Sequence, residues 1–160
     1  MRTYDEDAAL AEELKAHHAV MIRDLGRLSE NLAKAPASGA DAAQAKRALV
    51  EWVKDVLVPH AEEEEATTYR AAGELPEGRL LIKSMLAEHV LIRRTAEHMS
   101  AAKDPVEAGT YGRALFGIFD SHQRKKNDMI LPLLVDSDTV SLTEVMGRVH
   151  AHEHGHGHHH

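Results

Sequence analysis

The chain has 160 residues, enough for one domain with a substantial core and too few for two independent domains. It contains no cysteine, which excludes disulfides, thiolate metal sites and cysteine nucleophiles, so any metal site must use histidines and carboxylates. The formal net charge is −7, and the 19 lysines and arginines are scattered among 26 acidic residues, which argues against nucleic acid as a partner.

The composition also predicts the fold class. Aromatic residues make up only 4% of the chain, while alanine, leucine, glutamate and arginine abound, and this mixture favours an all-α protein. No stretch approaches the roughly 20 apolar residues that span a bilayer. Residues 1–14 lack the apolar core of a signal peptide. We therefore expect a cytoplasmic protein that does not bind membranes.

The first two helices are predicted over residues 5–34 and 41–72. In the first, apolar residues recur with spacings that alternate between four and three, as in a coiled-coil seam. The sequence "APASGAD" separates the two helices, and Asp41 can cap the second. The segment "GELPEG" then predicts a turn.

The third helix is predicted over residues 77–102. Asp104 is an N-cap followed directly by a proline, so the fourth helix begins there and ends near Leu134. We expect Pro132 to kink or close this helix, because proline lacks the backbone N–H that a helix needs.

Four long helices joined by short connections fit an up-down-up-down antiparallel four-helix bundle. Ser141 and Glu144 form a capping box, which predicts a short C-terminal helix. We expect the bundle and this helix to form one domain over residues 1–149, followed by a disordered His-rich tail over residues 150–160.

Four histidines occupy positions where the helix spacing calls for an apolar core residue. They are His18, His60, His89 and His122, one in each long helix. For example, His18 falls between Leu14 and Met21 without breaking the alternation of four and three. In the second helix the seam runs through Val53 and Val56 to the histidine, and in the fourth it runs from the histidine to Met129. Counted along antiparallel helices, the four histidines lie at compatible depths.

A carboxylate accompanies one of these histidines. Glu64 lies four residues after His60, so the two side chains stand about 5–6 Å apart on one helix face. A lone inward histidine is usually a core residue hydrogen-bonded to a carbonyl or water. Four inward histidines and a carboxylate at one level of the bundle would instead lack polar partners, unless a metal ion served as their common partner. Imidazole and carboxylate ligands favour iron, manganese or zinc over calcium or magnesium.

Four motifs together resemble one protein family. They are "LKAHHAVMIRDL", "PHAEEEEATTY", "MLAEHVLI" and "FDSHQRKKNDMILPLL", and the chain is similar to the hemerythrin-like, or HHE cation-binding, domains over about residues 8–135. The resemblance implies a four-helix bundle with a non-haem di-iron centre, held in the order His, His-x-x-x-Glu, His, His-x-x-x-Glu. It places the metal ligands at His18, His60, Glu64, His89 and His122.

The last motif departs from the family pattern, because Lys126 stands where a second glutamate ligand is expected. The seam turns this lysine inward, where its ammonium would repel a second cation and pair with Glu64. Three outcomes are open: one metal with about five ligands, two metals with Lys126 swung away, or a metal-free site with a Lys126–Glu64 ion pair. We favour one metal or reduced occupancy, and Asp128 points the wrong way to substitute.

Other residues are secondary candidates. His17 is an alternative ligand to His18, although it fits the seam less well, and Glu65 lies at the margin of the inward face. Tyr69 and Glu88 are candidates for orienting the ligands. His98 is off the seam and is expected at the surface.

The expected function is a non-haem iron protein that binds or senses O2, NO or peroxide, or holds iron, as a monomer or homodimer. One alternative is an iron-dependent enzyme that processes peroxide or NO. Another is a metal storage or delivery protein that uses the tail, since a run with seven histidines binds metal ions readily, although its last three residues also fit a truncated purification tag. A purely structural bundle is the remaining case.

Overall fold

The computed structural model describes residues 4–147, and the predicted His-rich tail lies outside the described residues. All regular elements within residues 4–147 are helical, which confirms the all-α prediction. In chain order they are α1 (Tyr4–Ser38), α2 (Ala42–Trp52), η1 (Val53–Leu57), α3 (Val58–Ala66), α4 (Thr68–Glu74), α5 (Arg79–Ala101), α6 (Pro105–Lys125), η2 (Lys126–Ile130) and α7 (Leu131–Asp136). A last helical segment covers residues 142–147. None of the helices described is both long and apolar enough to cross a membrane.

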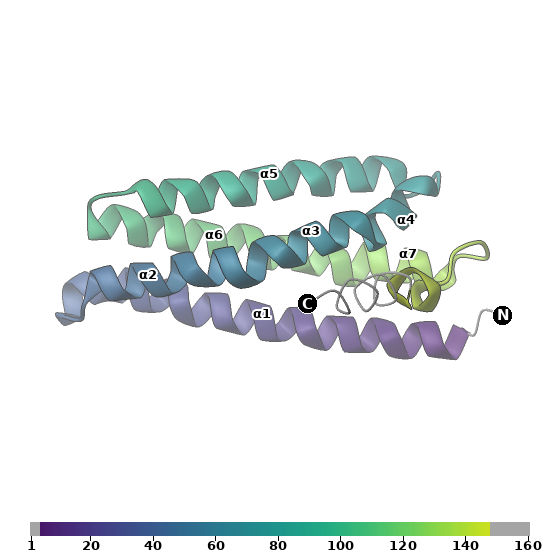
Figure 1. The fold of residues 1–160 in the computed structure, drawn as a ribbon, viewed down its shortest axis with the longest axis horizontal. Helices are drawn as coiled ribbons and strands as arrows, with labels where there is room; N and C mark the ends of the chain where they lie inside the picture. The colour runs from purple at the N-terminus through teal and green to yellow at the C-terminus, as the bar shows by residue number, and fades with distance from the viewer. Residues whose placement is uncertain (1–3, 148–160) are drawn as a thin grey trace, which may run out of the picture.

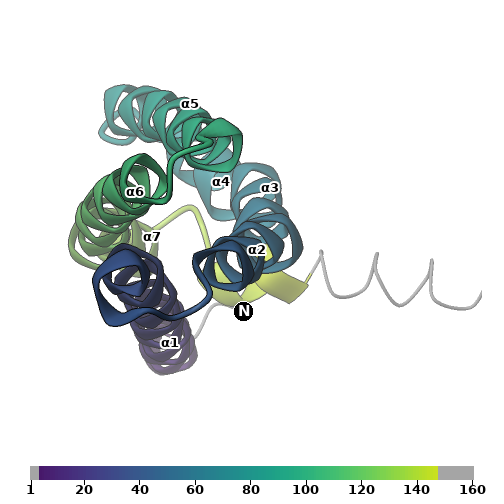
Figure 2. The ribbon, with the colours of Figure 1, turned by 90° about the vertical axis from the view of Figure 1, so that its left-hand side faces the viewer.

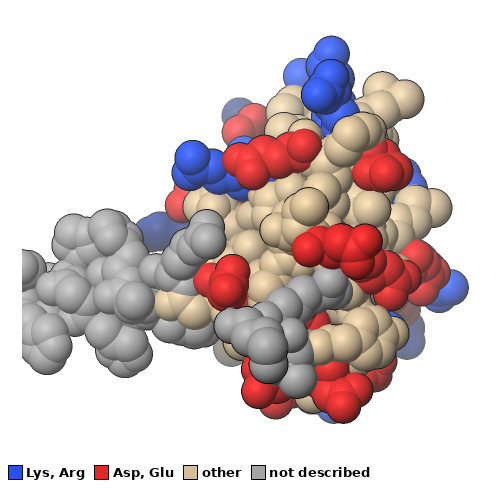
Figure 3. All heavy atoms as spheres, turned by 90° about the vertical axis from the view of Figure 1, so that its right-hand side faces the viewer, with Lys and Arg blue, Asp and Glu red and all other residues tan. Residues whose placement is uncertain are grey.

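The chain runs along the long axis of the molecule four times, first as α1, then as α2 to α4, then as α5, and last as α6 to α7 (Figure 1). Seen from one end, these segments surround a common centre (Figure 2). α1 packs along α6 and α2, and α5 packs along α6. Acidic side chains are spread over the opposite end (Figure 3), where α1 begins with the exposed residues Asp5 and Glu6. A helix N-terminus favours negative charge of this kind.

The first helix extends past its predicted end at residue 34. α1 continues through Pro36 to Ser38, so the prediction that "APASGAD" breaks it from the start is wrong. A proline removes one helical hydrogen bond, and α1 continues for only two residues beyond Pro36. Gly39 ends the helix instead, because its φ of 75° is a left-handed conformation that glycine adopts readily.

The second predicted helix is not continuous. α3 ends at Ala66, and Thr67, with φ −118° and ψ −92°, separates it from α4. The Thr67 hydroxyl donates to the Glu63 carbonyl at 2.7 Å, which satisfies a carbonyl at the end of α3.

Two π-helical turns each lead into a proline. η1 precedes Pro59 and η2 precedes Pro132, and each proline lies at the start of the next α-helix. Proline cannot donate to the carbonyl four residues earlier, and a widened turn accommodates the interrupted ladder. The kink or closure predicted at Pro132 therefore takes the form of a widened turn.

Each widened turn changes which residue faces the core. Val56 and Met129 were predicted to face inward, but they are 37% and 50% exposed. Leu57 and Ile130 are buried in their place. The prediction failed because it assumed the α-helical spacing of 3.6 residues per turn, and a π turn shifts the inward face by one residue.

The short C-terminal helix is held from the far end of the sequence. The Glu144 amide donates to the Ser141 hydroxyl at 3.4 Å, as the capping box predicts. The Asp7 carboxylate also accepts from the amides of Leu142 and Thr143 at 3.2 and 2.9 Å.

Asp104 caps α6 as predicted, accepting a hydrogen bond from the Val106 amide at 3.1 Å.

The core consists of two apolar clusters with buried polar residues between them along the bundle. In α1, His18 lies between Ala11 of one cluster and Met21 of the other. In α5, His89 follows Met85 of the first cluster and precedes Ile92 of the second. The fold therefore places the inward histidines in one layer between two apolar blocks.

Candidate metal centre

The structure brings the five predicted ligands into this layer. His18, Glu64, His89 and His122 are buried, the last only 1% exposed, and His60 is half-buried. The histidines come one from each of α1, α3, α5 and α6, and Glu64 comes from α3.

The ligand atoms fall into two groups that share Glu64. One group, the His18 half, contains His18, His60 and Glu64, and the other, the His89 half, contains Glu64, His89 and His122. In each group one ligand atom from every residue lies within 4.8 Å of the others. The donor set in both halves is therefore two imidazoles and one shared carboxylate.

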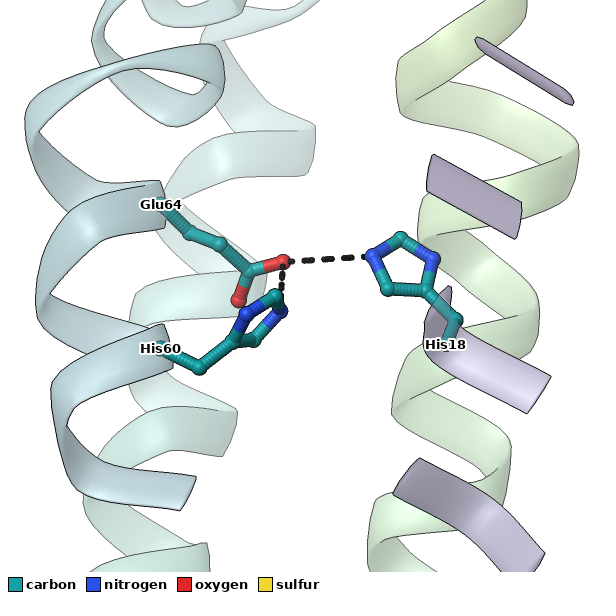
Figure 4. Close-up of side chains that lie close together, drawn as sticks. All are labelled: His18, His60 and Glu64. Carbon is teal, nitrogen blue, oxygen red and sulfur yellow. Dashed lines mark ion pairs between the residues drawn. The ribbon is translucent and has the colours of Figure 1, made fainter. Parts of the chain in front are cut away.

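The two oxygens of Glu64 face different halves. Oε2 lies 3.2 Å from His60 Nε2 and 3.8 Å from His18 Nε2, and Figure 4 shows the carboxylate turned toward both rings. Oε1 lies 3.7 Å from His89 Nε2. Glu64 is thus placed where a single carboxylate contacts both groups.

His18 presents an unprotonated nitrogen to the centre. Its Nδ1–H donates to Asn127 Oδ1 at 2.7 Å, so Nε2 carries the lone pair. Burial and the charge of Lys126 lower the pKa of His18 to about 3, which keeps the ring neutral at neutral pH. A neutral imidazole oriented through its other nitrogen is the form that ligates metals.

His122 is oriented in the same way. Its Nδ1–H donates to Glu88 Oε1 at 2.8 Å, and Lys125 binds the other oxygen of Glu88. Burial lowers the pKa of His122 to about 4, although the hydrogen bond to Glu88 opposes the shift. Nε2 is therefore unprotonated and accepts a hydrogen bond from the Tyr69 hydroxyl at 2.8 Å.

His89 has one ring nitrogen without a hydrogen bond. Tyr69 has a single hydroxyl proton, which it donates to His122. In the contact of 3.2 Å between the Tyr69 oxygen and His89 Nε2, the proton must therefore come from His89. Nδ1 then remains unprotonated, 3.4 Å from Glu65 Oε1, and makes no hydrogen bond. A metal on Nε2 would move that proton to Nδ1, where Glu65 can accept it, so the residues of the His89 half fit a metal ion.

Tyr69 lies between the two histidines of this half. Burial, reinforced by the negative charge of Glu64, raises the pKa of its hydroxyl above the usual value, so it remains protonated in the metal-free protein. Its oxygen contacts the Nε2 atoms of both His89 and His122. Tyr69 therefore contacts the candidate ligand nitrogens themselves, and Glu88 and Glu65 contact the outer nitrogens.

Lys126 lies in the His18 half. It is 2% exposed, its ammonium binds Glu64 Oε2, and Nζ is 3.4 Å from His60 Nε2. Burial raises the pKa of Glu64, but Lys126 and the neighbouring histidines outweigh this effect and hold it well below its usual range. Burial lowers the pKa of Lys126, and Glu64 opposes that change. The ammonium thus contacts two of the three candidate ligands of this half.

The remaining candidates lie outside both groups. His17 is exposed, with its ring 5.2 Å from that of His60. Glu65 lies on the outer side of His89, where Arg93 contacts it at 3.4 Å. Asp128 and His98 are exposed, as expected.

Reasoning from the sequence missed Asn127 as the partner of His18. Asn127 lies within η2, five residues after His122, and the regular spacing of an α-helix does not bring it to the inward face. The asparagine was visible in the last motif, but its partner depends on how α1 packs against this turn.

A family model described as the hemerythrin HHE cation-binding domain matches residues 9–134. The chain belongs to this family. The hemerythrin HHE match extends over the layer from His18 to Lys126 and includes both π turns. Membership implies cation binding, and it confirms the resemblance identified from the four motifs. Neither the curated proteins nor the solved structures compared with this chain gave a match.

Proposed function

We propose that this hemerythrin-like chain binds one non-haem iron ion in the His89 half, through Glu64, His89 and His122, and binds a small ligand such as NO beside it. The observation that carries the proposal is the contrast between the two halves. In the His89 half, both histidines have carboxylates on their outer nitrogens. In the His18 half, the Lys126 ammonium binds the carboxylate oxygen that a metal would need.

The donor set supports iron. Two histidines and one carboxylate are the ligands of mononuclear non-haem iron(II) centres, which keep open positions for a ligand. When bound, the iron supplies a redox-active ion with such an open position. Tyr69 is placed to contribute a further oxygen or to donate its proton to the ligand.

A small cavity adjoins this half. It measures about 10 Å³ and is lined by His89, His122, Glu64 and apolar neighbours that include Ile92 and Phe119. A cavity must have at least about this volume to hold a single water molecule. The cavity therefore favours the smallest ligands, of about the size of one water molecule.

The number of metal ions distinguishes among such ligands. Two-electron chemistry with O2 needs two iron(II) ions or an outside reductant, whereas iron(II) binds NO without either. A single iron in the His89 half thus favours binding of NO over two-electron reduction of O2.

The test is the iron content per chain, measured on the full chain and on protein truncated after Val149, because the tail would bind metal by itself. We expect about one tightly bound iron in the truncated protein, lost in His89→Ala and retained in His98→Ala, a matched change at an exposed histidine. NO titration followed by electron paramagnetic resonance should end at one NO per iron. Two irons per chain, or iron that survives His89→Ala, would contradict the proposal.

A further inference from the structure

A second, larger pocket opens beside the His18 half. It has a volume of about 230 Å³, and its polar side includes His18, His60, Glu64 and Lys126. The lining also contains the apolar residues Leu14, Ile130, Leu131 and Met146. These residues come from α1, α3, η2, α7 and the C-terminal helix.

The pocket is larger than a diatomic ligand requires. An engineered apolar cavity of about 150 Å³ binds benzene. At about 230 Å³, this pocket can hold an organic molecule of that size or somewhat larger. Its apolar wall would bury the body of such a molecule, which is the main source of affinity in small-molecule sites.

The polar side of the pocket offers both a donor and an acceptor. The ammonium of Lys126 has three N–H donors, and within the described residues its hydrogen bonds go to Glu64 and His60. His18 Nε2 is an acceptor, because the ring proton is on Nδ1, and no described residue donates to it. A hydroxyl group matches this pair, since it accepts through its oxygen and donates its proton.

The charges around the pocket disfavour an anion. The Glu64 carboxylate already neutralises Lys126 within the same layer. Glu63 also lines the pocket and adds a second carboxylate. A ligand carboxylate would therefore meet more negative than positive charge, whereas a neutral head group would not.

We propose that this pocket binds a small neutral molecule with a hydroxyl head, an alcohol or an organic hydroperoxide, whose apolar body is about the size of benzene. The hydroxyl accepts from Lys126 and donates to His18, and the body packs against Ile130, Leu131 and Met146. The inference rests on the proposed function in one respect: the iron is placed in the His89 half, which leaves the His18 half free of metal.

The experiment uses the metal-free full chain and three probes that share a tert-butyl body. They are tert-butanol, tert-butyl hydroperoxide and pivalate, and binding is followed by amide chemical shifts in NMR spectra. We expect both neutral probes to bind at the same residues and pivalate to bind at least tenfold more weakly. Tighter binding of the hydroperoxide than of the alcohol would identify a peroxide site, and the reverse would identify an alcohol site.

Two variants test the location. Met146→Trp fills the pocket and should abolish binding, while Val50→Trp, in the separate groove between α2 and α5, should leave it unchanged. Lys126→Met removes the donor and should weaken binding about three- to tenfold. Pivalate binding as tight as tert-butanol, or binding unaffected by Met146→Trp, would overturn the proposal. Absence of tert-butanol binding would also overturn it. Because no iron is present, these outcomes are independent of the iron count.

Discussion

Replacing Lys126 with glutamate is expected to convert the proposed one-metal centre into a two-metal centre. The substitution removes the ammonium from the His18 half and places a carboxylate four residues after His122, on the buried side of the helix. The His18 half then has two imidazoles and two carboxylates, with no fixed cation among them.

The magnitude follows from the position of Nζ. It binds Glu64 Oε2 and lies 3.4 Å from His60 Nε2, so a metal on these two atoms would lie within roughly 4 Å of the ammonium. At that distance and an effective dielectric constant near 20, the repulsion is about 4 kcal/mol for each unit of charge on the ion. Removing it should strengthen binding of the second ion by at least about a thousandfold.

The assay is anaerobic titration with iron(II), followed by metal analysis of the washed protein. We expect about one iron per chain in the wild type and about two in Lys126→Glu. Lys126→Met is the matched control, because it removes the charge without adding a ligand, and its second ion should bind with intermediate affinity. One iron per chain in Lys126→Glu, in a protein that keeps its helical circular dichroism, would refute the reasoning.

Three further predictions concern single residues. Tyr69→Phe should weaken retention of the metal about 10- to 100-fold in chelator competition, because the hydroxyl contacts both histidine nitrogens of the His89 half; unchanged retention would contradict this. Asp7→Asn should lower the free energy of unfolding in urea by about 1–3 kcal/mol at pH 7. Burial raises the pKa of Asp7, but the hydrogen bonds from residues 141–143 outweigh it and lower the pKa below the usual 3.8. The stabilisation is therefore present above pH 3.8 and lost as the pH falls through the lowered pKa, so a difference that does not shrink as the pH falls below 3.8 would be evidence against it. Gly109→Ala should destabilise by about 1–3 kcal/mol, since its Cβ would lie 2.9 Å from Ala33 Cα, whereas Gly117→Ala, with nothing within 4 Å, should be neutral or stabilising in the same urea titrations.

Most of the helices could be predicted because their signals are local. The N-cap at Asp104, the turn after α4 and the apolar spacing of α1 each depend on residues within a few positions of one another. The spacing also identified His18 and His89 as inward-facing, and both are buried.

Local reasoning failed where the helical geometry itself changes. The π turns before Pro59 and Pro132 shifted the inward face by one residue, which exposed Val56 and Met129. The prolines were visible in the sequence. However, proline can kink, close or widen a helix, and the packing of the neighbouring helices selects among these.

The sequence by itself determined that four long helices each carry an inward histidine, that Glu64 accompanies one of them, and that a lysine replaces the last glutamate of the family pattern. The tertiary structure decided that Glu64 divides its oxygens between two groups, that Lys126 occupies only one of them, and that Asn127 orients His18. The reason is physical: helical periodicity gives a side chain its direction, but its partners lie on other helices. Only the packing of those helices sets the distances between the candidate ligand atoms.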